Sequence, residues 1–113
     1  MIAGADGVHL RADGPPVAAV RKIVPGGFLI GRSAHTDDEI DRAAGADYLV
    51  FGTVFATPSK PGVEGQGLDA LRRAVARFNG PVLAIGGVTP ANAPDVLATG
   101  AAGYAAIGAF LLE

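Results

Sequence analysis

The chain has 113 residues, no cysteine, a formal charge of −2 and 50% apolar residues. These values allow one domain, exclude disulfides and thiolate chemistry, and argue against nucleic-acid binding, which needs clustered Lys and Arg. No apolar run approaches the roughly 20 residues of a membrane span, so we expect a cytoplasmic protein that acts on small molecules.

Five short apolar runs along the chain predict buried strands. They cover residues 7–10, 28–31, 47–52, 82–86 and 103–108. Strands that are apolar almost throughout are typical of parallel sheets covered on both faces, whereas strands with one covered face alternate with polar residues. The runs therefore predict an α/β fold built from parallel (β/α) units.

Helical patterns separate these runs. Two apolar helix faces are predicted, one from Val17, Val20, Ile23 and Val24 and one from Leu68, Leu71, Ala74, Val75 and Phe78. Thr36 and Glu39 have the spacing of a capping box, and Thr89 is followed by a first-turn proline. Two further helices are therefore expected to begin at Thr36 and Thr89.

A glycine stands just before three of the strands, at Gly4, Gly45 and Gly100, where it would end a helix in the left-handed conformation. Only three residues precede Gly4, so we expect residues 1–113 to be an N-terminally truncated domain. The predicted architecture is the C-terminal half of a TIM-type (β/α)8 barrel with about five strands. The alternative is an independent doubly wound domain, which normally opens with a strand.

Two glycine turns suggest a phosphate site. Gly86 and Gly87 follow a strand and precede a helix, so their backbone amides would face an anion at a positive helix end. A second small-residue turn at Ile107 and Gly108 ends the last strand, and barrels commonly bind phosphate between their last two strand loops. The alternative interpretation is that Gly86 and Gly87 only form a tight turn.

Other polar residues follow the strands. Lys60 lies between two prolines in a long segment, 53–67, where it would either meet a phosphate or remain a solvated lysine. Ser33 and His35 follow the second strand, and His35 would either exchange a proton or hold its loop through a hydrogen bond. His9 alternates with apolar neighbours and is interpreted as a packed, hydrogen-bonded histidine. The His, Asp and Glu residues have no convincing zinc spacing.

Taken together, five motifs resemble the thiamine phosphate synthase and TenI family over about residues 4–110. The motifs are Gly7-Val8-His9-Leu10, Gly31-Arg32-Ser33-Ala34-His35, Gly45-Ala46-Asp47-Tyr48, Thr57-Pro58-Ser59-Lys60 and Ala84-Ile85-Gly86-Gly87-Val88-Thr89. They follow one another in the order of the family and with similar spacing. The resemblance covers nearly all of this chain but about half of the family's barrel.

The resemblance implies thiamine biosynthesis by a transferase. In such a synthase a pyrimidine diphosphate loses pyrophosphate with the help of magnesium, and the nitrogen of a thiazole phosphate captures the resulting cation. By resemblance, Ser33 contacts the pyrimidine, and Lys60 stabilises the leaving pyrophosphate. The remaining substrate contacts are implied for Thr57, Ser59, Gly86, Gly87, Ile107 and Gly108, the last four forming a phosphate cup mainly through backbone amides.

The sequence departs from the synthase pattern at a few positions. Asp13 is displaced by one residue from the expected magnesium aspartate, and the basic diphosphate-binding motif would lie before Met1. Thr53 stands where thiazole tautomerases of the TenI type have a histidine, and threonine is no acid or base near neutral pH. A tautomerase and a non-catalytic phosphate-binding module are therefore the alternatives to a synthase domain. We expect the fragment to be inactive alone and to self-associate or pair with a complementing half-barrel.

Overall fold

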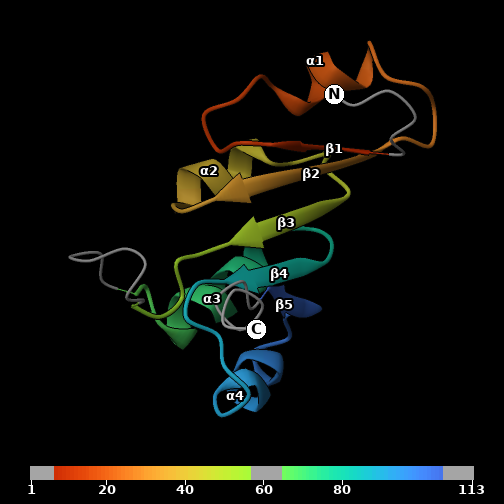
Figure 1. Cartoon of the computed structure of the whole chain (residues 1–113). Helices are drawn as coiled ribbons and strands as arrows, with labels where there is room; N and C mark the ends of the chain where they lie inside the picture. Colours follow the sequence, from red (N-terminus) through yellow and green to blue (C-terminus); the bar gives the residue numbers. More distant parts are fainter. Residues whose placement is uncertain (1–6, 57–64, 106–113) are drawn as a thin grey trace.

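The computed structural model of the protein describes residues 7–56 and 65–105, in which five strands alternate with four helices (Figure 1). The strands are β1 (Gly7–Leu10), β2 (Leu29–Ala34), β3 (Tyr48–Phe51), β4 (Val82–Ile85) and β5 (Gly103–Ala105). The helices are α1 (Val17–Arg21), α2 (Asp37–Arg42), α3 (Leu68–Arg77) and α4 (Ala93–Ala98). In these two ranges no helix is long and apolar enough to cross a membrane.

All neighbouring strands pair in parallel, and the sheet order β1-β2-β3-β4-β5 follows the chain. This order confirms the predicted α/β fold of successive parallel (β/α) units, which is how a (β/α)8 barrel is wound. A doubly wound sheet would reverse its strand order partway, so the doubly wound alternative is wrong.

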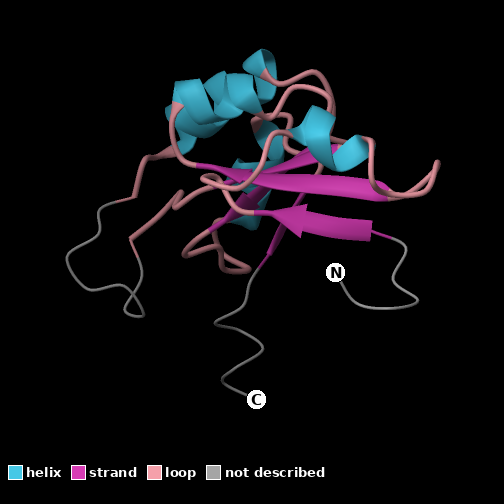
Figure 2. Ribbon diagram, turned by 90° about the horizontal axis from the view of Figure 1, so that it is seen from above, coloured by secondary structure: helices cyan, strands magenta, loops and turns pink. Residues whose placement is uncertain are grey.

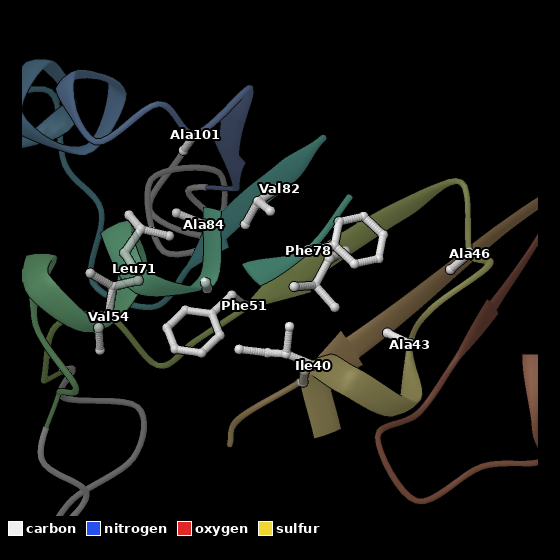
Figure 3. Packing of buried hydrophobic residues seen from close by; sticks show 14 of the residues in the cluster. Ile40, Ala43, Ala46, Phe51, Val54, Leu71, Phe78, Val82, Ala84 and Ala101 are labelled. Atoms are coloured by element: carbon white, nitrogen blue, oxygen red, sulfur yellow. The ribbon is translucent and has the colours of Figure 1, made fainter. Parts of the chain in front are cut away.

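The helices gather on one side of the sheet, and the core lies between them and the strands (Figure 2). Ile40, Phe51 and Leu71 come from α2, β3 and α3 and share this apolar layer (Figure 3). On the other side Leu29 is 53% exposed and Val50 only partly buried. In the described residues, the strands are thus covered on one face, not on both as their composition predicts.

Two local predictions are wrong. The α-helix α1 ends at Arg21, so Ile23 falls beyond the predicted apolar helix face and is 80% exposed. The helix α4 begins at Ala93, four residues after Thr89; the Thr89 hydroxyl accepts the Asn92 amide at 3.3 Å and so caps the turn that precedes the helix. The capping-box prediction at Thr36 is confirmed, since its hydroxyl accepts the Glu39 amide at 3.1 Å.

Asp47, the residue before β3, links β3 to β2 at the amino-terminal end of the two strands. Its Oδ2 accepts the backbone amide of Ile30 at 2.7 Å and lies 3.0 Å from the Arg21 guanidinium. The Ile30 hydrogen bond, followed by Arg21, holds the pKa of the Asp47 carboxyl below its ordinary value of 3.8. The side chain therefore fixes the entry of β3 beside β2.

Replacing Asp47 by Ala is expected to lower the free energy of unfolding by about 1 kcal/mol, because a partly buried amide loses its acceptor in a setting screened by solvent. Asp47→Asn, which keeps an acceptor, should lose less. The wild-type contribution is complete above the ordinary pKa and is lost as the pH falls through the lower folded-state pKa. Urea unfolding between pH 2 and 7 checks both points; equal stability of the alanine variant and the wild type at pH 7 would contradict them.

Candidate functional site

The carboxyl ends of the parallel strands meet at one edge of the sheet, and the polar residues follow the strands there. Asp13 comes after β1, Ser33 and His35 end or follow β2, and Gly86 follows β4. Parallel α/β folds place their ligands at this edge, because the loops after the strands converge on it. The edge is therefore the candidate site.

A cavity of about 370 Å³ opens at this edge between the ends of β1 and β2. We name it the β1–β2 cavity. Its lining brings together three residues singled out in the sequence, Asp13, Ser33 and His35, with Arg11, Ala12 and Glu39. The lining carries both signs of charge, which suits a polar ligand rather than an apolar one.

Two hydrogen bonds hold His35 in place, one through its backbone and one through its side chain. Its backbone amide donates to Glu39 Oε1 at 2.8 Å, and its Nδ1 lies 2.8 Å from the carbonyl oxygen of Gly52, after β3. A carbonyl oxygen only accepts, so Nδ1 carries a proton and the neutral ring has its lone pair on Nε2. These contacts show the loop-holding role that the sequence left as one of two alternatives.

Arg32 organises the wall of the β1–β2 cavity, a role that the sequence analysis missed. The residue is 3% exposed, and its guanidinium donates to the carbonyl oxygens of Ala12, Gly14 and Pro15 in the loop after β1. The Nε atom is buried without a partner among the described residues. A signal was available, since an arginine inside an apolar strand needs buried acceptors.

Replacing Arg32 by Leu should lower the free energy of unfolding by about 2 kcal/mol, because loop carbonyls lose their donors in a buried place. Arg32→Lys should recover only part of the loss, since one ammonium group does not match the planar guanidinium. Arg72→Leu, at an exposed position of α3, is the control and should change stability little. Guanidinium unfolding of the three variants checks this. If Arg32→Leu is as stable as the control, the hydrogen bonds of Arg32 to the loop after β1 do not stabilise the fold.

Ser33 also takes part in a polar cluster on the uncovered face of the sheet. Its Oγ lies 2.7 Å from Nε2 of His9, whose ring stacks on Tyr48 with centroids 5.9 Å apart. Partial burial lowers the pKa of the His9 imidazole below its ordinary value of 6.5. The prediction of a packed, hydrogen-bonded His9 is therefore confirmed for the hydrogen bond, although more of the side chain stays exposed than a packed residue implies.

The turn at Gly86 and Gly87 needs glycine for backbone reasons. Both residues have positive φ, and a Cβ on Gly87 would come within 2.7 Å of the Phe55 Cβ. In the described part of the chain the Gly87 amide donates no hydrogen bond. Because α4 is short and starts only at Ala93, the helix end adds nothing to this site.

The described residues do not form a metal site. None of them belongs to a group of three or more His, Cys, Asp or Glu side chains close enough to bind an ion. The carboxylate of Asp13 pairs with Arg11, with 3.3 Å between Oδ1 and Nε. Five other predicted site residues lie outside the described residues: Thr57, Ser59, Lys60, Ile107 and Gly108.

The described residues form a parallel α/β fold whose candidate ligand site lies where the strands end. The family model for thiamine monophosphate synthase matches residues 1–110. The thiamine-phosphate synthase of Methanoculleus marisnigri is 50% identical over 114 residues, covering 98% of this chain and 54% of that protein. The chain belongs to the thiamine monophosphate synthase and TenI family, a family of thiamine biosynthesis.

Solved structures agree with this assignment. A thiamine phosphate pyrophosphorylase from Pyrococcus furiosus superposes with a TM-score of 0.76 at 39% identity, over 90% of this chain and 49% of that one. A 3-hexulose-6-phosphate synthase, 24% identical with a TM-score of 0.60, shares the fold. The chain spans about half the length of the curated relatives it matches.

Proposed function

We propose that this chain supplies the phosphate-binding half of a thiamine phosphate synthase. The whole enzyme condenses a pyrimidine diphosphate with a thiazole phosphate and releases pyrophosphate. The observation that supports this proposal is the placement of the β1–β2 cavity and the Gly86-Gly87 turn at one sheet edge, in a chain that belongs to the family.

The proposed roles divide along this edge. Ser33 contacts the pyrimidine in the β1–β2 cavity, and the amide of Gly87 receives a phosphate oxygen, as amides of such turns do. Gly86 gives that turn its shape. Four residues outside the described ranges complete the proposal by family resemblance, with Thr57 and Ser59 on phosphate oxygens and Ile107 and Gly108 in the phosphate cup.

Lys60, also outside the described residues, is proposed as the group that stabilises the leaving pyrophosphate. A fixed cation beside a departing anion lowers the barrier because negative charge grows there in the transition state. Catalysis of this kind rests on position and charge rather than on a covalent intermediate with the protein.

Magnesium belongs to the proposal only for the complete enzyme. The described residues alone do not fit the ion, because Asp13 is a single exposed carboxylate paired with Arg11. We propose that Asp13 provides at most one ligand. The other oxygen ligands would come from the diphosphate and from protein outside the described residues, as is usual for magnesium at phosphate sites.

A TenI-like thiazole tautomerase is the second candidate, and one observation favours it. His35 reaches the carbonyl of Gly52, the residue before Thr53, and its Nε2 has a lone pair in the neutral ring. A base therefore stands next to the position where tautomerases of the family have their histidine. A non-catalytic phosphate-binding module is the third candidate.

Thiazole phosphate should shift the backbone amide resonance of Gly87, whereas the dephosphorylated thiazole alcohol should not, because the Gly87 amide meets the phosphate group. The measurement is a nitrogen–proton NMR titration of the labelled chain with each compound. Gly27, an exposed glycine before β2 at the opposite end of the strands, serves as the control amide. Equal responses of Gly87 to both compounds would reject the phosphate site.

The isolated chain should self-associate and should not make thiamine phosphate. In the described sheet β1 and β5 are edge strands and one face has no helix cover, so apolar surface and unpaired backbone groups face solvent. Light scattering checks association. Condensation assays with both substrates and magnesium check activity, alone and with a separately expressed N-terminal half of a related synthase. A monodisperse monomer with substantial unaided turnover would overturn this proposal, and activity only with the added half would support it.

A further inference from the structure

Three adjacent strands contribute to one polar cluster on the uncovered face of the sheet. We define the His9 cluster as His9 on β1, Gly31 and Ser33 on β2, and Tyr48 on β3. His9, Gly31 and Tyr48 occupy one row, since His9 pairs with Gly31 and Gly31 pairs with Tyr48. Ser33 lies two residues further along β2 on the same face and also lines the β1–β2 cavity.

Gly31 makes the cluster possible by leaving room above β2. A Cβ at this position would overlap the Cζ and Cε2 atoms of Tyr48, so the Tyr48 ring lies where any other side chain would be. The ring can therefore cross β2 and stack on His9 with an interplanar angle of 27°. Glycine is needed here for space, because Gly31 is not among the positive-φ glycines.

The distances around His9 distinguish its two nitrogens. Nε2 lies 2.7 Å from Ser33 Oγ, which is hydrogen-bond distance whichever of the two atoms carries the proton. Nδ1 lies 3.4 Å from Tyr48 Oη, a longer contact. In the neutral ring one nitrogen carries the proton and the other accepts; with the proton on Nδ1, the Ser33 hydroxyl donates to Nε2.

We propose that His9 is a positioning residue that draws the Ser33 proton away from the β1–β2 cavity and so presents Ser33 Oγ to the ligand as a hydrogen-bond acceptor. The position then selects a heteroaromatic ligand that carries an N–H donor, such as an amino substituent, over one that carries only an acceptor. The ligand part of this proposal rests on the proposed function, and the orientation of the hydroxyl does not.

The orientation is tested without any ligand. Long-range nitrogen–proton NMR of the labelled chain, at a pH where His9 is neutral, reports which ring nitrogen carries the proton. We expect the Nδ1–H tautomer in the wild type and a change of the Nε2 shift in Ser33→Ala. An Nε2–H tautomer, or His9 shifts that ignore Ser33→Ala, would overturn the proposal.

The selectivity is tested with 4-aminopyrimidine and 4-methoxypyrimidine, which differ in whether the substituent donates. We expect the wild type to prefer the amino compound about three- to tenfold, the ratio that one net hydrogen bond supplies. His9→Gln should keep the preference, because its side-chain oxygen reaches the place of Nε2. Ser33→Ala and His9→Asn should both lose it, since Asn matches only the Nδ1 side of the ring.

The outcomes distinguish the positioning role of His9 from the proposed contact between Ser33 and the pyrimidine. A preference that disappears in Ser33→Ala but survives in His9→Asn would show that His9 does not position the hydroxyl. A double variant that loses no more than either single variant would support the coupling of the two side chains. If neither compound binds the wild type, the pyrimidine assignment and the selectivity fail together, while the nitrogen shifts still decide the orientation of Ser33.

Discussion

Ile30, Leu49 and Leu71 are completely buried where the sheet meets its helices, and this apolar layer determines the place of the other features. A helix between consecutive strands returns the chain to the other end of the sheet, so all strands run in the same direction and their carboxyl ends meet at one edge. The residues after the strands are thereby brought together from distant parts of the sequence. The β1–β2 cavity arises in this way, from segments about twenty residues apart.

The alternation of side chains along β2 divides the polar residues between two tasks. Arg32 points to the covered side, where it holds the loop after β1, whereas Ser33, the next residue, belongs to the uncovered face and the cavity. Neighbouring residues on one strand thus shape the wall of the cavity and line its interior. A shift of register by one residue would exchange these tasks, so the pairing of β1 with β2 supports both.

Much of the fold was predictable because it follows from local patterns. The apolar runs predict the five strands, the Thr36 cap predicts α2, and Gly45 and Gly100 take the positive φ expected of glycines that end helices. The exposed Ile23 and the late start of α4 were not predictable in the same way, since periodicity does not show where a helix stops. The family resemblance carried the assignment of Ser33. The hydrogen bonds of Arg32 to the loop after β1, and the space above Gly31 that the Tyr48 ring fills, depend on contacts between strands that no local pattern contains.

The glycines of the site show why composition alone is a weak guide to ligand binding. Gly86 has positive φ and packs against Thr53, so the turn requires glycine whether or not a phosphate binds. The proposal of a phosphate site therefore rests on the position of the turn at the edge where the cavity opens, not on the glycines themselves. The same reasoning applies to the His9 cluster. A histidine, a serine and a tyrosine on an uncovered strand face would be ordinary solvated residues, but Gly31 leaves the space that lets them touch, and one of the three lines the cavity.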